Sequence, residues 1–254
     1  MTLFDTISDR KTLIKAWRSL VKRPVSEGFD EISIEKFRES LEGQLDEIEK
    51  QLSEGAYRFY PLKLYLLQKK DGGHRTIKIP SVRDRVVQKA IASTIYPYLD
   101  KKYKLDNKVS YAYLPTKKLQ DASERILELR SKGYRYVCKA DIEKFFDNIN
   151  KNKLLKMIYD ALPDESLNKI IKAAVLNDID SKDFQYYEYK TGKAYKYDRV
   201  VGIAQGSPLS PMLANLYLHD FDAELIKAGF EVIRYADDLL FMCKNKGDAE
   251  DQFH

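Results

Sequence analysis

The chain has 254 residues, of which 44% are hydrophobic and 33% are charged, and its formal net charge is +5. This composition excludes a disordered chain, and no apolar run is long enough to cross a bilayer. The first residues lack the basic-then-apolar order of a secretory signal, so we expect a cytoplasmic protein. Cys138 and Cys243 lie in apolar runs without metal-ligand companions, which predicts buried free thiols.

Helices are predicted in the first quarter of the chain. Residues 11–22 have the pattern of a short amphipathic helix. Residues 33–54 predict one longer helix, because apolar residues recur every three or four positions after the candidate N-cap Ser33. Gly55 would end this helix. The segment from Glu27 to Glu54 is acidic, with ten acidic and three basic side chains.

A β-hairpin is predicted next. Residues 62–68 and 75–80 have strand-like composition, and residues 71–73 (Asp-Gly-Gly) form a typical hairpin turn. A helix is expected to follow from Ser81, and another over residues 117–131.

The segment from residue 61 to residue 120 is basic. It holds fourteen Lys and Arg side chains against four Asp and Glu. The tyrosines interleaved with these charges are Tyr65, Tyr96, Tyr98, Tyr103, Tyr111 and Tyr113. Cations mixed with stackable rings suit a polyanion that carries bases. The alternative is a solvated basic face whose tyrosines lie partly in the core.

The second half of the chain alternates strand and helix signals. Residues 134–140 predict a buried strand that ends at Asp141, and Asn150 is a candidate cap for the next helix. Residues 180–200 are polar and rich in tyrosine, which predicts a hairpin or a mobile loop. Residues 208–226 predict a single helix with prolines in its first turn.

A pair of adjacent aspartates lies between two strand-like runs near the end of the chain. The sequence predicts a hairpin with Asp237 and Asp238 at its tip, where a cation would relieve their mutual repulsion. If the strand that ends at Asp141 joins the same sheet, three carboxylates meet at one edge. Oxygen ligands favour Mg²⁺, and such a set suits two ions acting on a phosphate. The alternative is a simple turn, in which Asp is common.

Several blocks, in order, resemble the reverse transcriptase family, especially its bacterial and group II intron branch. RYADDLLF resembles the Tyr-x-Asp-Asp hairpin, KADIEKFFDNI the first carboxylate motif, and GIAQGSPLSPMLANLYL the Gln-Gly motif of that family. KKDGGHRTIKIPSVRDRVVQKAI resembles the fingers motif, and GFDEISIEKF and SYAYLPTKKLQDA resemble two further blocks. Together these ordered blocks are far more specific than any one of them.

The resemblance implies an RNA-directed DNA polymerase of the α/β (α+β) class. Its right-hand fold would comprise fingers over residues 1–130 and a palm over residues 131–254, with an antiparallel palm sheet packed by helices. The implied partners are an RNA template, a DNA or RNA primer and dNTPs, with no membrane. The implied cofactor is a pair of Mg²⁺ ions, for which Mn²⁺ could substitute. The metal ligands would be Asp141, Asp237, Asp238 and the backbone carbonyl of Ile142.

The resemblance also assigns residues to the nucleotide pocket. Phe146 matches the aromatic steric gate that leaves no room for a 2′-hydroxyl, so deoxynucleotides are expected to be preferred. Arg75 matches the fingers arginine that grips the triphosphate, and Lys69 is a second basic match whose register depends on the turn. Gln205 and Gly206 match the motif that lines the pocket.

Alternative interpretations exist for some of these residues. Phe146 could pack in the core beside Phe145, and only one of the pair should be buried. Tyr235 would contact the primer end or simply pack. Ser207 could cap a helix. Residues 163–200 match the family poorly and are given no role.

Other functions compete with the polymerase assignment. The chain ends sixteen residues after Asp238, before the family's remaining palm motifs and its thumb, so we expect either a fragment or a further polypeptide that supplies the thumb. A non-catalytic RNA-binding fragment, an RNA-dependent RNA polymerase, and an enzyme of protein-primed or untemplated synthesis are the alternatives. Mobile introns, retrons, CRISPR-associated systems and phage defence are all compatible settings.

Overall fold

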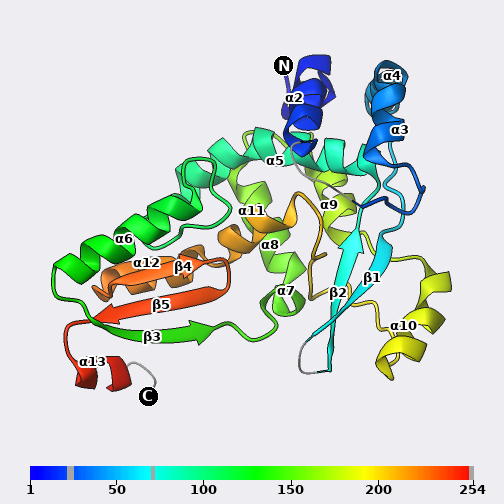
Figure 1. Cartoon of the computed structure of the whole chain (residues 1–254). Helices are drawn as coiled ribbons and strands as arrows, with labels where there is room; N and C mark the ends of the chain where they lie inside the picture. Colours follow the sequence, from blue (N-terminus) through cyan, green and yellow to red (C-terminus); the bar gives the residue numbers. More distant parts are fainter. Residues whose placement is uncertain (22–25, 70–71, 252–254) are drawn as a thin grey trace. The chain divides into compact units, whose positions relative to one another are not determined.

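The structure, a computed structural model, describes residues 1–21, 26–69 and 72–251 and contains helices together with two antiparallel sheets (Figure 1). This is the mixed class that the sequence predicts. The helices are α1 (Leu3–Ser8), α2 (Arg10–Leu20), α3 (Ile34–Glu39), α4 (Leu41–Ser53), α5 (Val82–Tyr103), α6 (Leu119–Ser131), α7 (Phe145–Asn148), α8 (Lys151–Ala161), α9 (Asn168–Leu176), η1 (Ser181–Asp183), α10 (Phe184–Thr191), α11 (Ser210–Tyr217), α12 (His219–Lys227) and α13 (Lys246–Asp251). The strands are β1 (Lys63–Gln68), β2 (His74–Ile79), β3 (Tyr136–Asp141), β4 (Val232–Tyr235) and β5 (Asp238–Cys243).

The chain packs as two compact units. The first comprises Met1–Pro97 and Ile149–Ser210, and the second comprises Tyr98–Asn148 and Pro211–His254. Each unit is therefore built from two separate stretches of sequence, and a division at residue 130 does not describe the packing. The assignment of residues 1–130 to fingers and 131–254 to palm stays a prediction about functional parts.

Helix α5 supplies much of the core of the first unit. Its first three turns are buried nearly all round, as expected of a helix enclosed in a core. The buried apolar residues are Val82, Val86, Val87, Ala90, Ile91 and Ile95. Asp84 is also buried and accepts hydrogen bonds from the Tyr57 hydroxyl at 2.7 Å and the Tyr60 amide at 2.9 Å. Burial raises the pKa of Asp84 to about 6, and its hydrogen bonds anchor the segment that leads into β1.

The acidic helical region is two helices. Ser33 caps α3 by accepting from the Lys36 amide at 3.2 Å, as predicted. The prediction of one helix over residues 33–54 is wrong, because the chain breaks at Ser40 between α3 and α4. The Ser40 hydroxyl donates to the Lys36 carbonyl at 3.2 Å, and such local bonds compete with the helical pattern. Gly55 ends the region with φ at 66°, as predicted.

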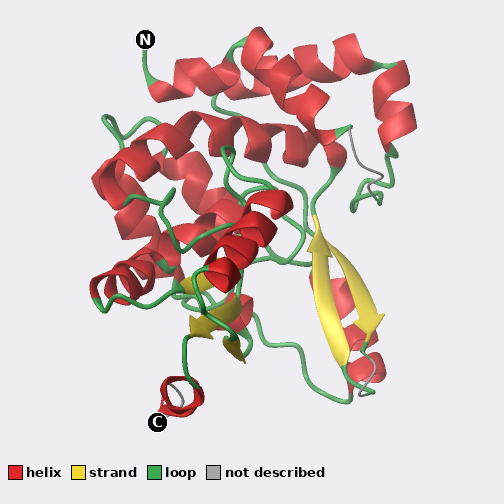
Figure 2. Ribbon diagram, turned by 60° about the vertical axis from the view of Figure 1, so that its left-hand side comes forward, coloured by secondary structure: helices red, strands yellow, loops and turns green. Residues whose placement is uncertain are grey.

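Strands β1 and β2 form a twisted two-stranded ribbon in the first unit (Figure 2). Their register runs from Lys63 opposite Ile79 to Gln68 opposite His74, which confirms the predicted strand pair. Asp71, the first residue of the predicted turn, lies outside the described residues. Every side chain of the two strands is half-buried or exposed, so the ribbon has no buried core of its own.

Residues 181–191 are helical. The prediction of a hairpin or mobile loop over residues 180–200 is wrong there, because η1 and α10 occupy this stretch. Gly192 ends α10 in the left-handed conformation, with φ at 68°. The segment lacks a helical apolar stripe, but Phe184 stacks on Tyr195 at 4.8 Å between ring centroids. Aromatic packing rather than hydrophobic periodicity therefore holds it.

The second unit is built around a three-stranded antiparallel sheet in the order β3–β5–β4. Apolar clusters lie on both faces of the sheet, and Figure 1 shows its three strands, β3, β5 and β4, side by side. One face packs against α6 through a cluster of Tyr111, Ala122, Leu129, Ile233 and Met242. The other face packs against α12 through a cluster of Val109, Leu225, Val232 and Leu239. The central strand β5 is therefore held from both sides.

Strand β3 differs from its prediction. The sequence predicts a buried strand over residues 134–140, but only Cys138 in β3 is buried. Tyr136 and Val137 are exposed, and β3 is an edge strand, which has a neighbouring strand on one side only. Cys138 and Cys243 are both buried free cysteines, as predicted.

The predicted helix over residues 208–226 is also two helices. Helix α11 ends at Tyr217 and α12 begins at His219, so the single-helix prediction is wrong. Each helix has its own buried polar anchor: Asn215 donates to the Ala112 carbonyl at 2.8 Å, and Asp222 binds a buried arginine. None of the described helices combines the length and apolar character needed to cross a membrane.

Candidate active site

The Asp237–Asp238 pair lies at the tip of the β4–β5 hairpin, as the sequence predicts. Tyr235 and Asp238 are the closing pair, which leaves Ala236 and Asp237 as a two-residue loop. Ala236 has φ at 61°, and a positive φ at the first loop residue is the pattern of a type II′ turn. Glycine usually occupies that position, so the alanine carries backbone strain of about 1–3 kcal/mol.

Asp141 lies at the same end of the same sheet. It is the last residue of β3 and stands directly opposite Asp238 in the antiparallel register. Opposed side chains share one face of a sheet, with Cβ atoms about 4.5–5.5 Å apart. The Ile142 amide donates to the Asp237 carbonyl at 3.2 Å, which ties the turn to the end of β3. The structure therefore brings the three aspartates together within the second unit.

A lysine neutralises part of this acidic edge. Lys139 Nζ lies 3.1 Å from Asp238 Oδ1, and Lys139 shares its face of β3 with Asp141. More than half of each side chain is exposed, so this ion pair is worth about 1 kcal/mol or less. It leaves the carboxylate oxygens available to a stronger cation.

The donor set at this edge suits a hard divalent ion. Carboxylate oxygens from Asp141, Asp237 and Asp238 are the ligands that Mg²⁺ prefers. Within residues 1–21, 26–69 and 72–251, no three His, Cys, Asp or Glu side chains already surround a point where an ion could sit. The residues fit the ion by chemistry and by shared position, and their side chains would have to turn inward to bind it. The role of the Ile142 carbonyl stays a prediction.

The aromatic pair that follows Asp141 divides as the sequence analysis requires. Phe145 is buried, with 5% of its surface exposed, and its ring lies 6.4 Å from that of Tyr217. Phe146 is half-buried and meets Phe145 edge to face at 5.6 Å. Phe145 is therefore the core residue, and Phe146 is partly exposed.

The Gln205–Gly206 segment lies against β2 in the first unit. The Lys78 amide donates to the Gln205 carbonyl at 2.7 Å. Gly206 has φ at 120°, and a Cβ added there would lie 2.7 Å from the Lys78 carbonyl oxygen. Only glycine fits at this position, because the two backbones approach too closely for a side chain.

The predicted phosphate-binding residues also lie on the β1–β2 ribbon. Arg75 is exposed on β2 opposite Leu67, three residues before the strand meets Gln205 at Lys78. That separation is about 10 Å along a strand. Lys69 follows β1, and its amide donates to the Gly73 carbonyl at 2.7 Å while its side chain is exposed. The β1–β2 ribbon therefore carries both Lys69 and Arg75. Strand β2, which holds Arg75, also contacts the Gln205–Gly206 segment.

Sequence reasoning missed a polar cluster that fixes β2. Asp178 Oδ1 accepts from Lys78 Nζ at 2.7 Å and from the Tyr195 hydroxyl at 2.6 Å. The Asp178 carbonyl also accepts from the Leu62 amide at 2.9 Å, just before β1. Burial and the Asp178 carboxylate raise the pKa of Tyr195. Residues 163–200, which the sequence leaves without a role, thus hold the ribbon at both strands.

The tyrosines of the basic segment divide between surface and core. Tyr65 and Tyr113 are exposed and could stack on a ligand. Tyr111 is buried in the α6 cluster, so for this tyrosine the alternative interpretation, a ring in the core, is the one that holds. Lys117 lies over the Tyr111 ring at 4.6 Å instead.

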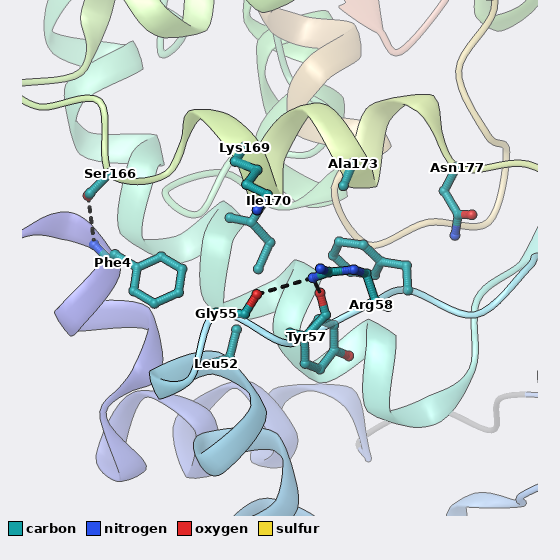
Figure 3. Close-up of a pocket in the computed structure, with 11 residues that line it drawn as sticks. Phe4, Leu52, Gly55, Tyr57, Arg58, Ser166, Lys169, Ile170, Ala173 and Asn177 are labelled. Carbon is teal, nitrogen blue, oxygen red and sulfur yellow. Dashed lines mark hydrogen bonds between the residues drawn. The ribbon is translucent and has the colours of Figure 1, made fainter.

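A separate cavity of about 400 Å³ opens in the first unit (Figure 3). Apolar side chains such as Phe4, Leu52 and Ile170 line most of it, and Arg58 turns back to donate to the Gly55 and Tyr57 carbonyls. None of the predicted site residues lines it. The cavity is therefore independent of the predicted nucleotide-binding residues.

Comparison with known families gives an independent result. The family described as "Reverse transcriptase (RNA-dependent DNA polymerase)" matches residues 67–253 of the chain. This range contains the aspartates and every residue predicted for the nucleotide pocket.

Individual relatives agree with the family match. An "Uncharacterized 91 kDa protein in cob intron" of Schizosaccharomyces pombe is 31% identical over 189 residues, which is 74% of this chain and 22% of that protein. The "Group II intron-encoded protein LtrA" of Lactococcus lactis subsp. cremoris is 27% identical over 202 residues, 78% of this chain and 29% of that protein. A solved "Partial Cas6-RT-Cas1–Cas2 complex" contains a chain with 27% identity and a TM-score of 0.58, covering 96% of this chain and 39% of that one. The chain thus spans less than half the length of these relatives.

Proposed function

This chain belongs to the reverse transcriptase family, and on that premise we propose that it extends a primer 3′-hydroxyl with deoxynucleotides on an RNA template. The observation that carries the proposal is the cross-strand placement of Asp141 opposite Asp238, with Asp237 in the adjoining turn. Adjacent carboxylates repel one another, and a catalytic cation is the simplest reason for a fold to gather them. Because the chain spans only part of its relatives, its activity, substrates and partners are all proposals.

The ions belong to the same proposal. Asp141, Asp237 and Asp238, with the Ile142 carbonyl, would hold two Mg²⁺ ions. When bound, such ions lower the pKa of the attacking hydroxyl and neutralise charge on the triphosphate. The strained, two-residue turn supports this role, because backbone strain is concentrated at functional sites.

The chain's other residues would select and orient the nucleotide. Phe146 would lie under the sugar and exclude a 2′-hydroxyl, which its half-buried ring beside the buried Phe145 supports. Arg75 would donate two parallel hydrogen bonds to phosphate oxygens. Gln205 would hydrogen-bond the nucleotide, while Gly206 allows the close backbone approach to β2.

Relatives suggest the biological setting. One is named for a group II intron and one for a Cas6-RT-Cas1–Cas2 complex. We propose that this chain acts in a setting of the same kind, as part of a mobile intron or a CRISPR-associated assembly, with RNA as its nucleic-acid partner.

Primer extension tests the proposal. The purified protein is given a DNA primer annealed to an RNA template, dNTPs and Mg²⁺, and labelled products are resolved by length. We expect extension to the template end. The variant carrying Asp237→Asn and Asp238→Asn should make no product while it retains RNA affinity, measured by fluorescence anisotropy. Glu124→Gln, which removes an exposed charge from α6, is the matched control and should extend normally.

Other outcomes separate the competing functions. RNA binding without extension by the unmodified protein would favour a non-catalytic RNA-binding protein. Preferential incorporation of rNTPs in a mixture with dNTPs would favour an RNA polymerase. Product formed without a template would favour untemplated synthesis. Full activity of the double Asn variant would contradict the assignment of the carboxylates.

A further inference from the structure

A buried arginine lies directly beneath the Asp237–Asp238 turn. Arg234 is in β4, two residues before Ala236, and only 1% of its surface is exposed. Its guanidinium has five N–H donors, and each has a partner in the second unit. Nε and Nη2 each donate to an Asp222 carboxylate oxygen at 2.6 Å. Nη2 also donates to Ser110 Oγ at 2.9 Å.

One of the two remaining donors connects the arginine to the turn. Nη1 donates to Asn215 Oδ1 at 3.0 Å and to the Ala236 carbonyl at 2.9 Å. The Ala236 carbonyl belongs to the peptide group that joins Ala236 to Asp237. A donor held at that oxygen fixes the plane of this peptide, and with it the direction in which the Asp237 side chain leaves the backbone.

The arginine is itself rigidly held. Asp222 is 1% exposed and also accepts from Asn107 Nδ2 at 3.1 Å. Both backbone polar groups of Arg234 are hydrogen-bonded to one segment. The Arg234 amide donates to the Val109 carbonyl at 2.8 Å, and the Arg234 carbonyl accepts from the Tyr111 amide at 2.9 Å. Segments from α11, α12, β4 and residues 107–112 therefore converge on one guanidinium.

Stability alone does not account for this arrangement. A buried ion pair contributes little more to folding than well-packed apolar residues of the same volume, because desolvation offsets the attraction. Ala236 also adopts a positive φ that an alanine adopts rarely, so the turn needs an external constraint. The guanidinium provides that constraint at the one carbonyl between the strained residue and Asp237.

We propose that Arg234 is a positioning residue, which holds the Ala236–Asp237 peptide so that Asp237 and Asp238 face Asp141. The inference rests on the proposed function for its catalytic consequence, but its structural content is independent of activity. The guanidinium contacts neither substrate nor reacting atoms. It acts through the turn, and the polar cluster of Ser110, Asn215 and Asp222 orients it.

The decisive variant is Arg234→Lys in the full-length protein. Lysine keeps the charge beside Asp222 but lacks the planar fork that reaches the Ala236 carbonyl at the same time. Amide exchange of residues 235–238, measured by mass spectrometry without ions or nucleic acid, should accelerate about tenfold or more. We expect kcat for extension to fall about 10- to 100-fold, because small displacements of catalytic groups have effects of that size. The dNTP KM should change little.

A second substitution distinguishes positioning from folding. Glycine adopts the conformation of Ala236 without strain, so Ala236→Gly added to Arg234→Lys should restore slow exchange at the hairpin and much of kcat. A purely structural role predicts no such recovery, since glycine replaces none of the lost bonds. Arg125→Lys is the matched control, because Arg125 also bonds two carboxylates of the second unit, Glu128 and Glu231, without contacting the turn.

The outcomes separate this inference from the proposed function. If the unmodified protein makes no DNA, the proposed function fails, and the exchange measurement still decides the role of Arg234. Unchanged hairpin exchange in a folded Arg234→Lys protein would overturn the inference. So would faster exchange across the whole second unit without recovery by glycine, which would show a general loss of stability. If Arg234→Lys does not fold, Asn215→Ala takes its place in the same measurement. This substitution removes the acceptor of one Arg234 Nη1 hydrogen, next to the hydrogen bonded to the Ala236 carbonyl. Amide exchange of residues 235–238 must then become faster.

Discussion

The two strand systems of this chain are held in opposite ways. The β3–β5–β4 sheet has apolar clusters on both faces and a buried arginine under its turn. The β1–β2 ribbon has no buried side chain, and its fixed points are polar: the Lys78 amide bonded to Gln205 and the Lys78 ammonium bonded to Asp178. One system is fixed by packing and the other by a few long-range hydrogen bonds.

This difference matches the roles proposed for the two systems. Carboxylates that share metal ions must keep one geometry, which a packed sheet supplies. Residues that grip and release a triphosphate benefit from an element of low local stability. We therefore expect changes in the sheet to affect kcat and changes in the ribbon to affect the KM for dNTPs.

The largest expected effect is at the sheet. Asp238→Asn should lower kcat about 1,000-fold or more, because the loss of a metal-binding carboxylate costs several kcal/mol of transition-state stabilisation. RNA affinity should stay within about twofold of the unmodified protein. Steady-state extension and anisotropy measure the two quantities. If the Asp238→Asn variant keeps a kcat within about threefold of normal, the sheet does not carry the catalytic carboxylates.

The next effect is on the choice of sugar. Phe146→Val should lower the preference for dNTPs over rNTPs about 10- to 100-fold, because a smaller side chain admits the 2′-hydroxyl. Competition between the two nucleotides in single-step incorporation measures the preference. If the preference is unchanged while the protein becomes less stable, Phe146 packs in the core and does not act as the gate.

At the ribbon, Arg75→Lys should raise the KM for dNTPs about tenfold, which corresponds to about 1.4 kcal/mol. Lysine keeps the charge but not the two parallel hydrogen bonds, so kcat should change much less. Arg38→Lys, an exposed arginine of α3, serves as the control. If Arg75→Lys lowers kcat and leaves the KM for dNTPs unchanged, the ribbon does not differ from the sheet in the way proposed.

The smallest effect concerns the support of the ribbon. Asp178→Asn removes the charge that pairs with the half-buried Lys78 ammonium. Because such a pair is worth about 1 kcal/mol, we expect the KM for dNTPs to rise about two- to fivefold. Amide exchange in β2 should become faster, while exchange in β5 stays the same. Glu165→Gln, an exposed change in the same unit, is the control. Equal acceleration in both strands would contradict the independence of the two systems.

Sequence alone predicts the parts of this fold that local chemistry determines. The hairpin around Asp237, the strand that ends at Asp141 and the cap at Ser33 all follow from turn, strand and capping preferences. The helix over Phe184–Thr191 and the exposure of β3 depend on tertiary contacts, which leave no periodic signal. The break at Ser40 is local, but the apolar residues continue at helical spacing across it, so periodicity does not reveal it. The buried role of Arg234 was equally hidden, because a lone arginine in a strand reads as a surface residue.

The most direct test of the account is where divalent ions bind. Crystals of the protein with template–primer, a non-hydrolysable dNTP and Mn²⁺ allow the ions to be located by anomalous scattering. We predict two Mn²⁺ ions about 3.5–4 Å apart, coordinated by Asp141, Asp237 and Asp238. Bound nucleotide with no ion between these three carboxylates would contradict it.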